Sequence, residues 1–232
     1  MIRASIHQPN YLPWLGYFYK LLRSDVFVAL DDAQYTKGSY INRTKIKTPT
    51  GWQWLTVPVL TKGRLGQTIA EVQLNNRVPW SEHHLKAIRL NYARSQYFGE
   101  YLPALEDVLG RSCQKLADLN IGLIRYVSTL LGIETKIIIA SDLDCPLEGT
   151  ERLVEICRRV GADTYLSGSG GSKYQDEGTF AEAGIKLVYS DFVHPTYAQQ
   201  WGGFMSGLSI IDFLFNCGRK GVTLFKSAFA EK

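Results

Sequence analysis

The sequence predicts a single α/β domain over residues 1–232, built as a three-layer, mostly parallel sheet with helices on both faces. Two stretches carry this prediction: a strand–helix–strand pattern at residues 4–30, and an alternation of strands and helices that resumes at residue 135. The composition agrees, because 45% of the residues are hydrophobic and 21% are charged, as in ordinary globular proteins. A β excursion at about 38–75 and a helical insertion at about 79–131 are expected to interrupt the alternation.

The first thirty residues are predicted to form a βαβ unit. Ala4–Ile6 forms a short strand, a turn with Pro9 follows, and Pro13 suits the first position of a helix that ends near Arg23. Residues 25–30 are continuously apolar, with β-branched and aromatic side chains, which is typical of a buried parallel strand. A strand, a crossover helix and a second strand make a right-handed βαβ unit, whose two strands are parallel.

Residues 38–75 have a different pattern, which predicts strands added at the edge of the main sheet. Strands are expected at 52–59 and 68–74, with glycine turns between them. The run from Arg43 to Lys47 also alternates in the manner of a strand.

The helical insertion begins after this excursion. Helices are predicted at 79–94, at about 100–109 and at 116–131, because apolar residues there recur at the helical period. His83 and His84 fall on the polar first helix, so both are expected at the surface.

The last third of the chain returns to the α/β alternation. We expect strands at 135–140, 163–167 and 185–189, and helices at 150–159, 180–183 and 209–215. Thr150 is a candidate N-cap for the first of these helices, and Gly161 ends it.

The charge is concentrated near the N-terminus. The net charge is +4, but residues 1–64 hold nine Lys and Arg against three Asp, a net charge of +6. This excess predicts an anionic small-molecule partner, with a solvated basic surface as the alternative. The basic run is short, so polymeric nucleic acid is not expected as a partner.

The sequence also predicts a cytoplasmic location. No window approaches about 18 consecutive apolar residues, so no membrane span is expected, and the N-terminus lacks the pattern of a secretory signal. The four cysteines lie far apart without a CxxC motif, which argues against a zinc ribbon or a disulfide framework. The oligomeric state stays open.

Polar segments follow three of the predicted strands, where parallel sheets bind their ligands. We expect them to converge on one crevice shared by the N-terminal region and the last third of the chain. The candidate residues are His7, Gln8, Asn10 and Tyr11, then Asp31, Asp32, Gln34 and Tyr35, and then Ser167, Gly168, Gly170, Gly171, Tyr174 and Glu177.

His7 is the first candidate for catalysis, as a general base or a hydrogen-bond donor to a substrate. The alternative is a structural histidine bonded to the backbone of its turn. His194 is a second candidate. Asp31 and Asp32 are adjacent, so their side chains are expected on opposite faces; one would bind a metal–phosphate or a sugar hydroxyl, and the other would cap a turn.

The glycine-rich loop at 168–171 offers backbone N–H groups to an anion, or forms only a flexible turn. Arg43, with Asn42 and Lys45 beside it, is a candidate forked clamp for an anion, or a guard residue on a β edge. Trp14 is a candidate to stack on a sugar or base, or a core residue. Covalent Ser or Cys catalysis is not expected, since neither a G-x-S-x-G motif nor a Cys–His motif occurs.

Seven ordered motifs resemble the WbqC-like family over nearly the whole chain. They are His7–Phe18, Leu30–Tyr35, Asn42–Lys47, Trp54–Val59, Tyr165–Gly171, His194–Tyr197 and Leu208–Asn216. Thr44 departs from the family's pattern, in which an asparagine follows Arg43. The resemblance implies a role in lipopolysaccharide or O-antigen sugar biosynthesis.

The start of the chain is also similar to adenylate-forming nucleotidyltransferases and pantothenate-synthetase-like enzymes, which implies a Rossmann-like, nucleotidyltransferase-like start to the fold. Those enzymes carry H-x-G-H at the helix start, where Trp14 and Tyr17 stand here. ATP and magnesium are expected cofactors only under this second resemblance.

Three functions follow as hypotheses. The first is a transferase that N-acylates or aminoacylates a nucleotide-activated amino sugar, with Arg43, Lys45 and the 168–171 backbone on the diphosphate and His7 or Asp31 as base. The second is an ATP-dependent, adenylate-forming amide ligase with magnesium near Asp31 or Asp32. The third is a non-catalytic binding protein for a sugar nucleotide or a biosynthetic partner, in which His7, Arg43 and Tyr174 would not converge on one cleft.

Overall fold

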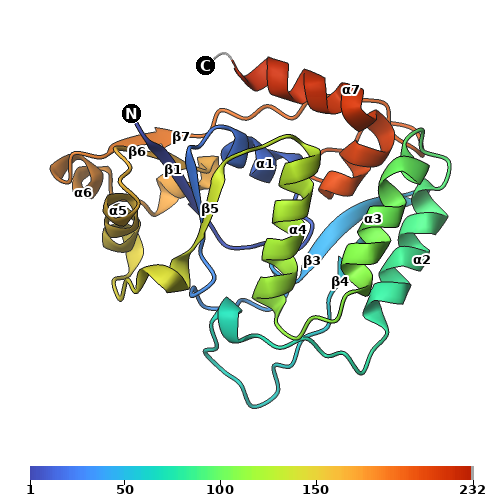
Figure 1. Ribbon diagram of the computed structural model, residues 1–232, viewed down its shortest axis with the longest axis horizontal. Helices are drawn as coiled ribbons and strands as arrows, with labels where there is room; N and C mark the ends of the chain where they lie inside the picture. Colours follow the sequence, from blue (N-terminus) through green and yellow to red (C-terminus); the bar gives the residue numbers. More distant parts are fainter. Residues whose placement is uncertain (231–232) are drawn as a thin grey trace.

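A five-stranded parallel sheet forms the centre of the computed structural model, which describes residues 1–230 (Figure 1). The strand order is β5-β2-β1-β6-β7. The strands are β1 (Arg3–His7), β2 (Val26–Ala29), β5 (Lys136–Ile139), β6 (Thr164–Ser167) and β7 (Lys186–Tyr189). The prediction of an α/β fold around a mostly parallel sheet is therefore confirmed. The extent of a single domain over residues 1–232 stays a prediction. Residues 231 and 232 lie outside the part of the chain that the structure describes.

The order of the strands creates a switch point between β1 and β6. The chain runs from β1 to β2 and later β5 on one side, and then crosses to β6 and β7 on the other side. All neighbouring strands pair in parallel, so their carboxyl ends share one edge of the sheet. This edge at the switch point is where parallel sheets bind ligands.

Helices cover both faces of the sheet, because alternate strand residues enter different cores. In β2, Phe27 and Ala29 pack into one core, while Val26 and Val28 pack into the other. The larger core includes α1 (Leu15–Leu22), α4 (Leu116–Leu130) and α7 (Ile210–Ala230), and the smaller includes α5 (Gly149–Arg159) and α6 (Glu177–Glu182). Figure 1 shows α5 and α6 on the opposite side of the strands from α4 and α7.

The helical insertion has the predicted number of helices. Besides α4, it contains α2 (Trp80–Tyr92) and α3 (Phe98–Gly110). The expectation that His84 lies at the surface is wrong: its ring is buried, with Nδ1 bonded to the Tyr11 hydroxyl and Nε2 to the Thr56 carbonyl oxygen. The residue faces inward because α2 packs against the β excursion.

The β excursion differs from the prediction in two ways. Its strands β3 (Arg43–Thr48) and β4 (Gly51–Thr56) form a separate antiparallel sheet rather than an extension of the main sheet. The predicted strand at 68–74 contains instead the short helix η1 (Ile69–Glu71). The Glu71 carboxylate accepts hydrogen bonds from the backbone and hydroxyl of Thr68, and this capping box favours a helical turn over a strand.

The remaining differences concern the ends of elements. Thr150 does not cap α5, because the helix begins at Gly149 and its N-cap is Glu148. The Thr150 hydroxyl accepts a hydrogen bond from the Asp176 amide, and Asp176 itself caps α6. The short helices η2 (Ala140–Leu143) and η3 (Ser169–Lys173) follow β5 and β6. Helix α7 extends beyond the predicted 209–215 and breaks at Gly218, which has a positive φ of 55°. The missing Cβ of Gly218 also leaves room for the Tyr97 ring.

Within residues 1–230, no helix has both the length and the apolar character needed to cross a membrane.

Candidate functional site

A cavity of about 770 Å³ opens at the carboxyl ends of the strands around the switch point. We call it the switch-point cavity. Its lining comes from the ends of β1 and β2, from β6 and the segment after η3, from the start of α5 and from the loop at 66–68. The polar lining residues are His7, Gln8, Asp32, Gln34, Thr68, Glu148, Thr150, Arg152, Tyr165, Tyr174 and Gln175.

His7 ends β1 and presents a neutral imidazole to this cavity. Its Nδ1 lies 2.9 Å from the carbonyl oxygen of Gln8, which can only accept, so Nδ1 carries the proton and Nε2 is the acceptor. Burial, and to a smaller extent the positive charge of Lys20, lower the pKa of His7 to about 3. The ring therefore stays uncharged at neutral pH.

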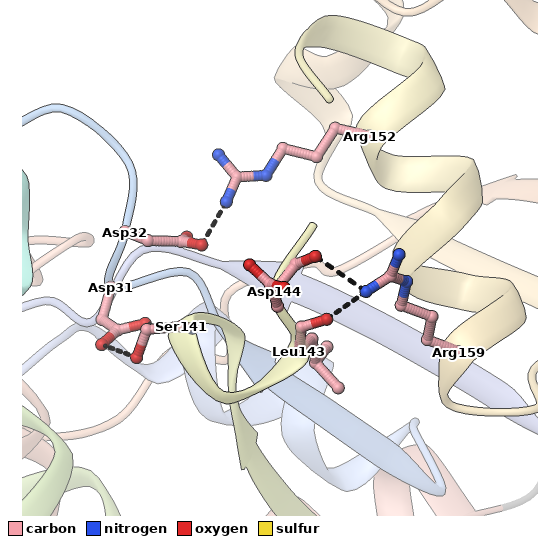
Figure 2. Close-up of polar contacts among 7 residues, drawn as sticks. All are labelled: Asp31, Asp32, Ser141, Leu143, Asp144, Arg152 and Arg159. Atoms are coloured by element: carbon pink, nitrogen blue, oxygen red, sulfur yellow. Dashed lines mark hydrogen bonds and ion pairs between the residues drawn. The ribbon is translucent and has the colours of Figure 1, made fainter. Parts of the chain in front are cut away.

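Asp32 and Arg152 form an ion pair on the wall of the cavity. Figure 2 shows Arg152 reaching from α5 toward Asp32, which follows β2. The two side chains are only 23% and 16% exposed, so water screens the pair little.

The lining also contains polar atoms that lack hydrogen-bond partners. Among the described residues, Asp32 Oδ1, Arg152 Nε and Gln175 Oε1 are buried without one. All three residues line the switch-point cavity. Buried polar groups are nearly always satisfied in proteins, so their grouping at one cavity indicates a ligand-binding site.

The start of α5 brings hydrogen-bond donors to the cavity, next to its N-cap residue Glu148. Gly149 and Thr150 line the cavity, so the first backbone N–H groups of α5 and the positive end of its dipole lie beside it. A positive residue in a first turn, such as Arg152, is unfavourable next to that dipole unless a negative group offsets it. At the other end of α5, Arg159 donates to the carbonyl oxygens of Leu143 and Asp144, which holds the helix in place (Figure 2).

Asp31 lies next to Asp32 but has a different environment. Its carboxylate accepts two hydrogen bonds from Ser141, at 2.9 Å from the backbone nitrogen and 2.8 Å from the hydroxyl (Figure 2). Asp31 is buried and does not line the switch-point cavity. The two carboxylates therefore have separate partners.

The structure brings some of the predicted site residues together. His7, Gln8, Asp32, Gln34 and Tyr174 line the switch-point cavity, so the N-terminal imidazole and the segment after the glycine-rich loop share one hollow. Arg43 does not line it, so the three residues named in the binding-protein hypothesis converge only in part.

The other predicted residues lie outside this lining. Tyr11 is buried against His84, Trp14 and His194 stack with ring centroids 6.2 Å apart, and Glu177 accepts a hydrogen bond from the Tyr189 hydroxyl. The residues outside the lining are Asn10, Tyr11, Trp14, Asp31, Tyr35, Asn42, Arg43, Lys45, Ser167, Gly168, Gly170, Gly171, Glu177 and His194. Their functional roles stay predictions.

The glycine-rich loop has a packing role. Residues 169–173 form η3, and the Gly171 amide donates to the Gly168 carbonyl oxygen. A Cβ at Gly171 would lie 2.1 Å from the Ser167 hydroxyl, so only glycine fits there. The loop places Tyr174 and Gln175 at the cavity.

Sequence reasoning did not select Arg152, Thr150, Tyr165 or Gln175. Arg152 had a detectable signal, because a cation in the first turn of a predicted helix opposes the helix dipole and points to a negative partner. Thr150 and Gln175 carried no signal, since ordinary α/β packing also uses a threonine and a loop glutamine, and Tyr165 was included only as part of the Tyr165–Gly171 motif.

Fold and cavity together define an α/β protein with a cavity at the switch point of a parallel sheet, the place where such sheets bind ligands. The model of the WbqC-like protein family matches residues 8–224, and the chain belongs to that family.

One curated protein is similar to the chain over nearly its whole length. The uncharacterized protein Rv1507c of Mycobacterium tuberculosis H37Rv is 38% identical over 220 residues, which cover 94% of this chain and 95% of that protein. No solved structure matches the chain significantly.

Proposed function

We propose that this protein is a cytoplasmic transferase that acylates the amino group of a nucleotide-activated amino sugar in the synthesis of a bacterial surface polysaccharide. The observation that carries the proposal is the switch-point cavity, where a neutral histidine, an Asp–Arg pair and a helix N-terminus meet. Its volume of about 770 Å³ lies in the range of ligand pockets.

The lining suits a sugar diphosphate. Arg152 and the first N–H groups of α5 supply positive charge and donors for phosphate oxygens. The unpartnered Asp32 Oδ1 accepts from a sugar hydroxyl, and the exposed Tyr174 ring offers a stacking surface at the mouth. Arg152 thus takes the role that sequence reasoning gave to Arg43 and Lys45.

His7 is the favoured base, because Asp31 is bonded to Ser141 outside the cavity. The sugar amine nitrogen attacks the acyl carbonyl carbon, forming a C–N bond while the bond to the leaving group breaks. The amine proton passes to His7 Nε2 and then to the leaving group. A bound diphosphate raises the pKa of His7 above its value in the empty site, which favours this transfer.

The first test measures binding by calorimetry with a panel of nucleotide-activated amino sugars. One or more should bind, and Arg152→Gln should weaken that binding at least about tenfold, as expected for a lost charge-assisted contact. Arg158→Gln, an exposed arginine on the same helix, is the matched control and should bind normally. If no panel member binds, the substrate assignment fails.

The second test measures transfer by the gain in mass of the bound sugar with a set of acyl donors. His7→Gln should keep nucleotide-sugar binding but lower turnover about 10²–10⁴-fold, the range for a general base. Binding without transfer would favour a binding protein. Product formation that consumes ATP and releases pyrophosphate would favour the adenylate-forming ligase.

A further inference from the structure

We infer that the β3–β4 hairpin carries a second ligand site, which binds the nucleotide portion of the acyl donor. The site consists of Arg43, Lys45, Trp52 and Trp54 with the neighbouring Tyr40, and we call this surface the hairpin face. The identity of the ligand as an acyl donor rests on the proposed function, whereas the binding of a nucleoside phosphate does not.

The register of the hairpin gathers these side chains on one side. Lys45 pairs with Trp54, and alternation along each strand places Arg43, Lys45, Trp52 and Trp54 together. The intervening residues Thr44, Ile46 and Leu55 are buried on the other side. One face of the hairpin therefore joins the core, and the other presents cations and indole rings.

The cations and rings are in direct contact. The guanidinium carbon of Arg43 lies 4.0 Å from the Trp54 ring centroid, and Lys45 Nζ lies 4.4 Å from that of Trp52. Tyr40 meets Trp54 edge to face at 5.4 Å. Trp52 is 45% exposed and Tyr40 is 44% exposed, so flat aromatic surface is open to a ligand.

The positive charge of the hairpin face has no acidic counterpart. Neither Arg43 nor Lys45 forms an ion pair with any acidic side chain of the described residues, unlike Arg89, Arg152 and Arg159. Polar atoms beside the face also lack partners: Arg43 Nε and the Tyr35 hydroxyl are buried and unbonded. A guanidinium held against a ring with its donors unused fits a phosphate group.

The loop before the hairpin connects the hairpin face to the switch-point cavity. Gln34 lines the cavity, and the next residue, Tyr35, lies close enough to Arg43 that the guanidinium charge opposes the rise in the Tyr35 pKa caused by burial. A ligand that lies across Tyr35 would have its phosphate at Arg43 and Lys45 and its other end at the cavity.

These features together select a nucleotide as the occupant. The two cations suit phosphate oxygens, and the exposed rings of Trp52 and Tyr40 suit a flat base, the combination used by proteins that bind nucleotides by stacking. The reactive acyl group of such a donor would extend toward His7. An acidic protein or an anionic glycan would use the charge but would not require a base-stacking ring.

The test measures binding of ADP, adenosine 3′,5′-bisphosphate and coenzyme A to the full chain by calorimetry and tryptophan fluorescence, without any sugar nucleotide. At least one should bind and quench fluorescence. Arg43→Gln should weaken binding at least about tenfold, through the lost charge-assisted contact. Trp52→Leu, a change at a half-exposed ring, should weaken it about fivefold or more, through the lost stacking.

Two controls separate this site from the switch-point cavity. Lys62→Gln removes an exposed cation elsewhere and should leave adenine nucleotide binding unchanged. Because the switch-point cavity is itself proposed to bind a diphosphate through Arg152, the probes are also measured on Arg152→Gln, in which binding should persist and should still be weakened by Arg43→Gln. Failure of all three probes to bind, or binding unaffected by Arg43→Gln and Trp52→Leu, would overturn the inference. Inorganic phosphate that competes as strongly as ADP would also overturn it, because the base would then contribute nothing.

Discussion

Replacing Asp212 by alanine is expected to lower the free energy of unfolding by about 3–5 kcal/mol, the cost of breaking a buried charged network. Asp212 lies in the first turn of α7 and is fully buried. Its carboxylate accepts hydrogen bonds from the hydroxyls of Tyr92 and Tyr197, each at 2.9 Å, and from the Gln199 amide at 2.8 Å. Alanine would leave the two tyrosine hydroxyls without this acceptor, and Gln199 Nε2 would keep only its hydrogen bond to the Met205 carbonyl oxygen.

The loss extends to a buried lysine. Lys47 is 3% exposed and donates to Gln199 Oε1 and to the carbonyl oxygens of Gly202 and Gly203. Burial lowers the pKa of Lys47, while the negative charge of Asp212 raises it, so removing Asp212 leaves the ammonium without its compensating charge. The whole segment before α7 is held to the hairpin and to α2 through this network.

Urea unfolding monitored by circular dichroism measures the effect, and limited proteolysis of residues 191–207 reports on local opening. The matched control is Asp107→Ala, whose ion pair with Arg111 is exposed and should contribute no more than about 0.5 kcal/mol. An Asp212→Ala protein as stable as the control would show that the network contributes little.

Local patterns in the sequence predicted most of the central fold. The continuous apolar run of β2 and the helical periods of α1 and α4 involve only residues close together in the sequence. The local pattern was therefore sufficient to predict these elements. The predicted strand at 68–74 failed for an equally local reason, because the Thr68–Glu71 capping box competes with strand formation.

Contacts between distant residues could not be predicted in this way. Asp32 meets Arg152 across 120 positions, and Tyr92 meets Asp212 across the same separation. The hairpin's separation from the main sheet also depends on tertiary packing, since its strand pattern is the same in either sheet. The predicted residues therefore line the switch-point cavity where strand ends determine position, as at His7 and Asp32. Arg152, which a helix from elsewhere in the chain supplies to the same cavity, was not predicted.

Replacing Lys20 by methionine is expected to stabilise the protein at pH 7 by about 1–3 kcal/mol, as found when buried charged groups give way to apolar ones. Lys20 lies on α1 and is only 5% exposed, and its Nζ donates to the Ile6 carbonyl oxygen at 3.2 Å. No carboxylate of the described residues pairs with it. Burial lowers the pKa of Lys20 to about 7. Near neutral pH, folding therefore disfavours the protonated form of this amine.

The effect depends on pH with a definite sign. Between pH 7 and the ordinary lysine pKa of 10.5, the unfolded chain binds a proton that the folded protein does not. The contribution of Lys20 to the free energy of unfolding therefore rises with pH, by about 2 kcal/mol between pH 7 and pH 9. The advantage of Lys20→Met over the natural protein should shrink by the same amount over that range.

Urea unfolding of the natural protein and of Lys20→Met at pH 7, 8 and 9 measures this difference, in which the titration of all other groups cancels. Lys226→Met is the matched control, because Lys226 also donates to a carbonyl oxygen, that of Gly132, but lies at the surface. The difference in free energy of unfolding between Lys226→Met and the natural protein should not vary with pH. A Lys20→Met difference that is also independent of pH would mean that the amine stays charged in the folded protein. The buried amine would then be solvated or paired in solution, and its influence on the neighbouring His7 would be that of a permanent positive charge.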